Sequence, residues 1–178
     1  MNKSLDQFDR NIILAGFMAT GKSAVGKELA RRLNRTLIDT DSLIEEMCGM
    51  TVAEIFARQG EEYFRERESE AVVMLDNYPA GSLVVSTGGG ILLRRENRHR
   101  LKQKGLLVLL SASPQEILRR ALKEGGRPLL EGSDPEGKIK ELLTKRKNIY
   151  SGAAVEVDTT GRTVSEVANE IVNALERL

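Results

Sequence analysis

A chain of 178 residues, 40% hydrophobic and 30% charged, has the length and composition of one soluble domain. Its net charge of +1 and aromatic content of 4% give no support for nucleic-acid binding through a basic surface or base stacking. One cysteine and one histidine exclude an intrachain disulfide and a zinc cluster of these residue types. The first ten residues are polar and no apolar run approaches a membrane span, so we expect a cytoplasmic protein with no membrane partner.

Short apolar runs alternate with longer amphipathic segments along the chain. The runs predict β-strands at residues 11–16, 36–41, 82–87, 106–111 and 154–158. Most of the runs are continuously apolar, which is typical of strands that are covered on both faces. Strands alternating with helices predict an α/β fold, in which helices cover both faces of a mainly parallel sheet.

Start signals mark four of the helices between these strands. A Ser or Thr followed three residues later by Glu is typical of a capping box, and the pattern begins at Ser42, Thr51, Ser113 and Thr163. The last helix has an apolar face at helical spacing, formed by Val164, Val167, Ala168, Ile171, Val172 and Leu175. The stretch 125–135 is rich in glycine and proline but short, which predicts a mobile loop within one domain.

Residues 16–23, Gly-Phe-Met-Ala-Thr-Gly-Lys-Ser, match the phosphate-binding loop pattern G-x-x-x-x-G-K-[ST]. The pattern lies between a predicted strand and a predicted helix, which is the context that it requires. Backbone N–H groups and the helix N-terminus would bind phosphate oxygens, Lys22 would reach the β- and γ-phosphates, and Ser23 would contact Mg²⁺. The alternative is a chance match, but chance would then have placed two glycines, a lysine and a hydroxyl between the correct flanks.

The predicted strand at 36–41 ends in two acidic residues. Asp39 and Asp41 would point the same way from a strand, at the edge where ligands bind in parallel sheets. One carboxylate would hold Mg²⁺ with its hydration shell, and the other would accept a proton or a hydrogen bond from a substrate hydroxyl. The alternative for Asp41 is a helix cap, because Ser42 follows it. The ligand interpretation is favoured because the apolar run at 83–87 lacks the terminal Asp that often binds Mg²⁺.

The next predicted strand runs into Gly88, Gly89 and Gly90. Bare backbone lets a ligand approach closely and offers N–H groups to its hydroxyls or carboxylate. The alternative is an ordinary strand-to-helix turn, although such a turn seldom needs three consecutive glycines.

Three arginines are further candidates for the site. Arg65 follows an aromatic residue in a charged helical segment, and Glu68 could hold its guanidinium in place. Arg127 lies in the glycine- and proline-rich stretch, and Arg146 lies in a basic run. Phe64 beside Arg65 indicates that this arginine points inward, whereas Arg127 and Arg146, taken singly, are more typical of surface positions than of functional ones.

Taken together, these segments resemble the shikimate kinases over nearly the whole chain. The shared features are the loop at 16–23, Asp39-x-Asp41, Gly60-Glu-x-x-Phe64-Arg65-x-x-Glu68, Thr87-Gly-Gly-Gly90, Arg127-Pro-Leu-Leu130, Arg146-x-x-x-Tyr150 and Val157-Asp158-Thr159. Several are loose singly, but their combination and order are specific. Residues 1–10 look like an extension that the family core does not need.

The resemblance implies a three-layer P-loop kinase fold like that of nucleoside monophosphate kinases, with a parallel sheet in the order 2-3-1-4-5. It implies one domain over residues 1–178, with its core from about residue 10, a lid at about 122–135 and a substrate-binding helical region at about 42–78. The implied reaction transfers the γ-phosphoryl group of ATP to the 3-hydroxyl of shikimate, a step of aromatic amino acid biosynthesis. By the same analogy we expect a monomer.

Carried over by motif, Asp41, Lys22 and Arg127 are catalytic. Asp41 would bind the reacting hydroxyl, Arg65 and Arg146 would hold the substrate carboxylate, and the turn Gly88–Gly90 would complete the substrate site. The predicted ATP-binding residues are Gly16, Ala19, Thr20, Gly21, Lys22, Ser23, Ala24, Arg120, Arg127 and Arg162.

Among these residues, Arg120 would stack on adenine and Arg127 would close over the transferred phosphate, with Gly125 and Gly126 as hinges. We expect Ser23 and Asp39 to hold Mg²⁺. Many family members have glycine where this chain has Ala19, so the shape of the loop at that residue is a question for the structure.

Two other functions remain possible from the sequence. The first is a related small-molecule kinase, such as one acting on gluconate; the paired arginines and triple glycine favour a compact carboxylated polyol instead. The second is a nucleotide-binding module without activity, against which the complete set of Lys22, Ser23, Asp39, Asp41 and Arg127 argues.

Overall fold

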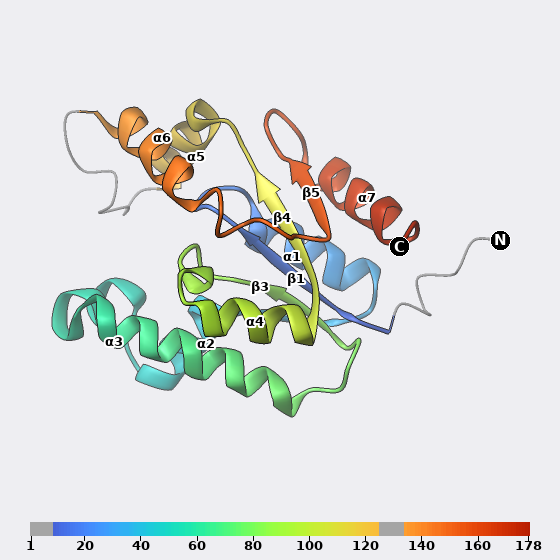
Figure 1. The fold of residues 1–178 in the computed structure, drawn as a ribbon, viewed down its shortest axis with the longest axis horizontal. Helices are drawn as coiled ribbons and strands as arrows, with labels where there is room; N and C mark the ends of the chain where they lie inside the picture. The colour runs from blue at the N-terminus through green and yellow to red at the C-terminus, as the bar shows by residue number, and fades with distance from the viewer. Residues whose placement is uncertain (1–8, 125–133) are drawn as a thin grey trace.

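A five-stranded parallel sheet with helices on both faces forms the molecule (Figure 1). It is seen in a computed structural model that describes residues 9–124 and 134–178. The strands are β1 (Asn11–Gly16), β2 (Thr36–Asp39), β3 (Leu83–Ser86), β4 (Gly105–Ser111) and β5 (Val155–Asp158). Their order is β2-β3-β1-β4-β5 and all neighbours are parallel, which confirms the predicted P-loop kinase architecture.

The central strand β1 is buried along its whole length because its residues are apolar or paired. Ile13 lies opposite Val85 of β3 and Leu107 of β4. Its last residue, Gly16, therefore opens the phosphate-binding loop at the carboxyl edge of the sheet, between the ends of the flanking strands. Parallel sheets bind ligands at this edge.

Alternate residues of β1 enter two different cores. Ile12 and Leu14 pack with α1 (Lys22–Arg32) and α7 (Val164–Leu175). Ile13 and Ala15 pack on the other face, where α3 (Val52–Met74), the short helix η2 (Leu75–Asn77) and α4 (Arg95–Lys104) lie. The remaining helices are α2 (Thr40–Cys48), η3 (Ile91–Leu93), α5 (Pro114–Glu124) and α6 (Pro135–Arg146).

The helices α5 and α6 lie side by side beyond the carboxyl end of β4 (Figure 1). Ile117 of α5 and Ile139 of α6 are fully buried and share a small core with Phe17 and Ala19 of the phosphate-binding loop. Polar side chains of α5 and α6 therefore lie close to the phosphate-binding loop. The predicted lid residues Gly125, Gly126 and Arg127 lie outside the described residues.

Two of the predicted capping boxes are confirmed and one is wrong. Thr51 and Thr163 each form both reciprocal hydrogen bonds of the box. Ser113 Oγ accepts the corresponding bond from the Glu116 N–H at 3.2 Å. Ser42, by contrast, lies inside α2, because Asp39 already caps that helix, two residues before the predicted end of the strand at 36–41.

The long helix α3 is interrupted at Gly60, whose φ of 84° and ψ of 173° are not helical. Glycine reaches this conformation without the strain that a side chain would add. The segment of α3 after Gly60 packs Phe64 and Ala71 against Ile44 of α2. No helix among the described residues is long and apolar enough to cross a bilayer.

Asn11 links β1 to its neighbours on both sides. Its Oδ1 accepts from the Leu83 N–H at 3.0 Å, its Nδ2 donates to the Lys104 carbonyl at 3.1 Å, and the residue is 3% exposed. We expect Asn11→Leu to lower the free energy of unfolding by about 2–4 kcal/mol, because two buried backbone groups lose their partners. Urea denaturation would measure the loss, with Asn173→Ala at an exposed position as control. Equal midpoints for the two variants would contradict the assignment.

Candidate active site

A cavity of about 400 Å³ opens at the carboxyl edge of the sheet, beside the phosphate-binding loop. Its wall contains Lys22 and Ser23 of the loop, Asp39 at the end of β2, Asp41 just beyond it, and Gly89 after β3. Residues from three separate segments, all selected from the sequence, therefore meet at one place.

The loop presents an anion site. Lys22 is 9% exposed, and its Nζ donates to the Phe17 carbonyl at 2.8 Å. Thr20 Oγ1 donates to the same carbonyl at 2.8 Å, which closes the loop on itself. The first turn of α1 carries no acidic side chain, so the positive end of the helix dipole is left for a ligand.

Ala19 takes the backbone conformation that a glycine would take. Its φ is 57°, in the left-handed region, which costs an alanine about 1 kcal/mol. Its methyl group is buried against Phe17 and Ala121. The departure from the family's glycine thus keeps the shape of the loop and adds an apolar contact.

Ser23 and Asp39 lie together and suit a divalent cation. Ser23 Oγ donates to Asp39 Oδ2 at 2.8 Å, while Asp39 Oδ1 accepts from the Asp41 N–H at 3.1 Å. The helix cap therefore holds the carboxylate with one oxygen toward the serine. A hydroxyl and a carboxylate oxygen at the phosphate-binding loop are donors that Mg²⁺ accepts when phosphate oxygens complete its shell.

Asp41 reaches the site, but not from the end of a strand. β2 ends at Asp39, and Asp41 lies in the first turn of α2. The prediction that alternation along a strand aligns the two carboxylates is wrong, and so is the alternative of Asp41 as the helix cap, since Asp39 is the cap. Asp41 converges on the cavity because its helix starts immediately above the sheet edge.

The glycine turn makes room for Asp41. A side-chain carbon at Gly88 would lie only 2.4 Å from Asp41 Oδ1, so any larger residue there would displace the carboxylate. The Gly88 N–H donates to Thr40 Oγ1 at 2.8 Å, which ties the turn to the start of α2. The absence of a side chain is therefore a requirement of the site, which is more than an ordinary turn would demand.

Arg65 and Arg146 lie against the next two glycines. A side-chain carbon at Gly90 would lie 2.1 Å from Arg65 Nη1. Arg146 Nη1 donates to the Gly89 carbonyl at 2.9 Å, and its guanidinium lies over the Phe17 ring at 5.1 Å. Two arginines from α3 and α6, far apart in sequence, thus flank the same bare turn.

Arg120 and Arg162 border a second cavity, of about 440 Å³, on the other side of the loop. Arg120 donates to the Ala19 carbonyl at 3.2 Å and to the Thr159 carbonyl at 2.7 Å. Arg162 donates to the Asp158 carbonyl at 3.0 Å. Gly21 and Ala24 also line this cavity, so these four predicted nucleotide residues share one cavity.

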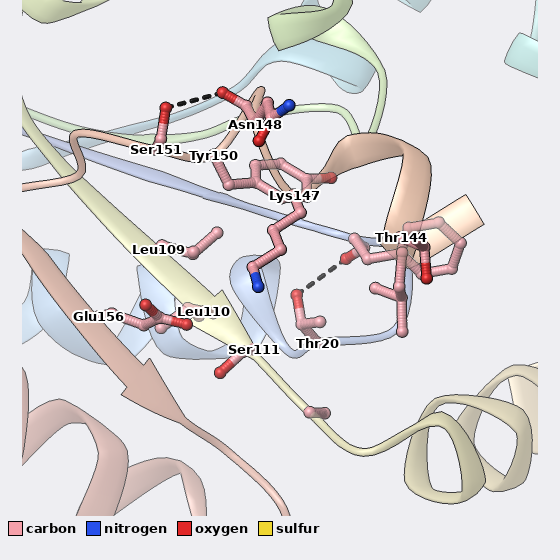
Figure 2. Close-up of a pocket in the computed structure, with 13 residues that line it drawn as sticks. Thr20, Leu109, Leu110, Ser111, Thr144, Lys147, Asn148, Tyr150, Ser151 and Glu156 are labelled. Carbon is pink, nitrogen blue, oxygen red and sulfur yellow. Dashed lines mark hydrogen bonds between the residues drawn. The ribbon is translucent and has the colours of Figure 1, made fainter. Parts of the chain in front are cut away.

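A larger cavity, of about 560 Å³, is not the predicted site (Figure 2). It lies between the end of β4, Glu156 of β5 and the segment after α6, where Lys147 extends into it. Thr20 is the one predicted site residue on its described wall. Volume alone would therefore have selected a place other than the predicted site.

Glu68 is the residue whose importance the sequence underestimates. It is 1% exposed, and its Oε2 accepts from Arg65 Nη1 at 2.7 Å. Its Oε1 is also buried and has no hydrogen-bond partner in the part of the chain that the structure describes. Burial raises the pKa of Glu68 to about 7, the negative charge of Asp41 adds to the rise, and the positive charge of Arg65 opposes it.

Comparison with known proteins identifies relatives of the whole chain. The family model described as shikimate kinase matches residues 18–176. A shikimate kinase of Caldanaerobacter subterraneus subsp. tengcongensis is 45% identical over 169 residues, which cover 95% of this chain and 98% of that protein. The structure of a shikimate kinase from Acinetobacter baumannii in complex with shikimate has a TM-score of 0.88, with 34% identity over 97% of this chain and 96% of that one.

A gluconokinase from Sinorhizobium meliloti shares the fold only. Its structure has a TM-score of 0.61 at 17% identity, over 96% of this chain and 93% of that one. Such a likeness reflects the common arrangement of sheet and phosphate-binding loop, and it says nothing about the substrate.

The raised pKa of Glu68 makes the free energy of unfolding depend on pH. Its pKa in the folded protein, about 7, lies above the ordinary value of 4.5. The contribution of Glu68 to the free energy of unfolding is therefore fully present below pH 4.5 and is lost as the pH rises through 7. We expect wild type to lose up to about 3 kcal/mol relative to Glu68→Gln between pH 5 and pH 8. Urea denaturation at several pH values measures this difference.

The control for this experiment is Glu70→Gln on the same helix, where the side chain is 47% exposed and pairs with Arg67. Its stability should follow that of wild type across the pH range. Parallel curves for wild type and Glu68→Gln would show that Glu68 stays ionised and would contradict the prediction.

Proposed function

The chain belongs to the shikimate kinase family, and from this premise we propose which of its residues bind ATP and shikimate and which take part in phosphoryl transfer. Members of the family phosphorylate shikimate with ATP in aromatic amino acid biosynthesis, and this chain is a kinase of that kind. We assign the 3-hydroxyl as the acceptor, by the resemblance stated above.

The phosphate-binding loop would hold the ATP phosphates. Lys22 would exchange its hydrogen bond to the Phe17 carbonyl for the β- and γ-phosphates, beside the positive end of α1. Ser23 and Asp39 would hold Mg²⁺, which supplies positive charge to the phosphate oxygens when it is bound. Arg120 and Arg162, at the neighbouring cavity, would border the adenine.

The glycine turn would hold shikimate, and its three neighbours carry the proposal. Asp41 lies against Gly88, Arg146 bonds to Gly89, and Arg65 lies against Gly90. Two guanidinium groups that lie against adjacent glycines of one bare turn suit a carboxylate, which arginine binds in a bidentate manner. A carboxylate seated there would bring a ring hydroxyl toward Asp41, within the cavity that also contains Lys22.

Asp41 would orient the reacting hydroxyl and accept its proton as the phosphoryl group arrives. Positioning and charge stabilisation account for most of the catalysis in this class of reaction. The resemblance adds Arg127 and a lid at about 122–135, residues of which the structure describes only the edges. Closing the lid would exclude water, so that ATP is not hydrolysed instead.

The substrate assignment is tested by one comparison of two acceptors. Purified protein with ATP and Mg²⁺ should release ADP with shikimate and at least about a hundredfold less ADP with gluconate, measured in a coupled assay. Gluconate as the better acceptor would favour the alternative kinase. Nucleotide binding with no turnover on either acid would favour a module without activity.

We also propose a single kinase domain that acts as a cytoplasmic monomer, without a nucleic-acid or membrane partner. The net charge of +1 and the single sheet with its two cores support this. Light scattering coupled to size exclusion would test the oligomeric state.

Replacing Asp41 with Asn should separate chemistry from nucleotide binding. Asparagine keeps the size of the side chain in the first turn of α2 but cannot accept the proton, so we expect turnover to fall by about 10²–10⁴ while ADP affinity changes less than about threefold. Steady-state kinetics and ADP titration measure the two effects. Asp76→Asn, at a surface pair with Lys104, is the matched control and should keep wild-type turnover. Similar losses of turnover and ADP affinity in Asp41→Asn would point to a structural role.

A further inference from the structure

Glu68 and Asp41 share the space behind the glycine turn. A side-chain carbon at Gly88 would lie 2.4 Å from Asp41 Oδ1 and 3.3 Å from Glu68 Oε1. The two carboxylate oxygens therefore stand no farther apart than the sum of these distances, and both are buried. A negative charge this close in a poorly solvated site raises the affinity of Glu68 for a proton.

Arg65 is the main group that favours the ionised form of Glu68. Arg65 Nη1 bonds to Glu68 Oε2 at 2.7 Å, and the guanidinium is 13% exposed. The other edge of the guanidinium bonds to Glu61 at 3.0 Å, where the carboxylate is 66% exposed and can be displaced into water. Arg94, which bonds to Ser69 at 3.3 Å, adds a weaker positive influence.

A substrate carboxylate at Arg65 would change this balance. It would share the guanidinium with Glu68 and bring another negative charge to the buried cluster. The favourable effect of Arg65 on the charged form of Glu68 would weaken, while the effects of burial and of Asp41 would remain. The least costly response is for Glu68 to become neutral.

We propose that Glu68 takes up a proton when the carboxylate of shikimate binds Arg65, so that proton uptake accompanies substrate binding. The inference rests on the proposed substrate site. The proton comes from the solvent and binds at Oε1, because Oε2 accepts from Arg65, and no other bond forms or breaks. Glu68 is a positioning residue here: it acts through Arg65 and does not touch the reacting atoms.

The pH range in which the proton is taken up is set by the pKa of Glu68 in the protein without substrate. Glu68 titrates near pH 7 before the substrate binds, so at pH 5.5 it is already protonated and has nothing to gain. Between about pH 7 and 8.5, binding should take up roughly half a proton. The chain has one histidine, His99, and it is exposed on α4, outside the buried cluster of Asp41, Arg65 and Glu68.

Isothermal titration of shikimate into the full chain, without nucleotide, measures this uptake. At pH 7.5 the observed enthalpy in PIPES and in Tris should differ in proportion to the ionisation enthalpies of the two buffers. Glu68→Gln should abolish the difference. Glu61→Gln is the matched control, because it removes the exposed partner of the same arginine and should keep the buffer dependence.

The outcomes separate this inference from the proposed function. Binding with equal heats in both buffers would overturn the proton uptake and leave the substrate site intact. A buffer dependence that persists in Glu68→Gln would assign the proton to another group and would also overturn the inference. Absence of shikimate binding to wild type would remove the proposed function and this inference with it.

Should Glu68→Gln fail to fold or to bind shikimate, wild type decides the matter by its pH profile. Uptake that is largest between pH 7 and 8.5 and close to zero at pH 5.5 supports the proposal. Uptake that stays constant or increases toward pH 5.5 contradicts it.

Discussion

The bare backbone of Gly88–Gly90 is the constraint on which the site depends. Asp41 and Arg65 occupy the volumes that side chains at Gly88 and Gly90 would fill, and Arg146 donates a hydrogen bond to the Gly89 carbonyl between them. The turn follows β3, whose neighbours are β1 with the phosphate-binding loop and β2 with Asp39, the proposed metal ligand. The residues proposed for nucleotide and for substrate therefore meet because three adjacent strands end at one edge.

This arrangement concentrates buried charge. Arg65 and Glu68 form an ion pair behind the turn, and Asp41 stands close to the same glutamate. Such a cluster costs free energy in the folded protein, since desolvation of each charge opposes the attraction between partners. The cost is consistent with function: a guanidinium whose partner can be neutralised is available to a substrate carboxylate.

Much of the fold could be predicted because its signals are local. The continuous apolar runs located all five strands, and the boxes at Thr51 and Thr163 located two helix starts. The end of β2 could not be predicted in this way, because the choice between a strand residue and a helix cap at Asp39 depends on what α2 packs against. Asp41 was therefore selected for a wrong geometric reason.

The site residues likewise divide into those that have a local sequence signal and those that do not. The phosphate-binding loop follows from its pattern, and the substrate arginines were selected only through resemblance to a family, since a lone arginine in a charged segment has no distinctive signal. The role of Glu68 depends on its burial and on Asp41 across the turn, which are tertiary facts. The proposed lid arginine, Arg127, stays a prediction.

A crystal structure of the protein with shikimate, ADP and Mg²⁺ would test the central claim most directly. We expect the shikimate carboxylate within hydrogen-bond distance of Arg65 and Arg146, and one ring hydroxyl at Asp41, facing the phosphate-binding loop. Shikimate bound elsewhere, for example in the larger cavity beside Lys147 and Glu156, with the glycine turn free of ligand, would contradict this account.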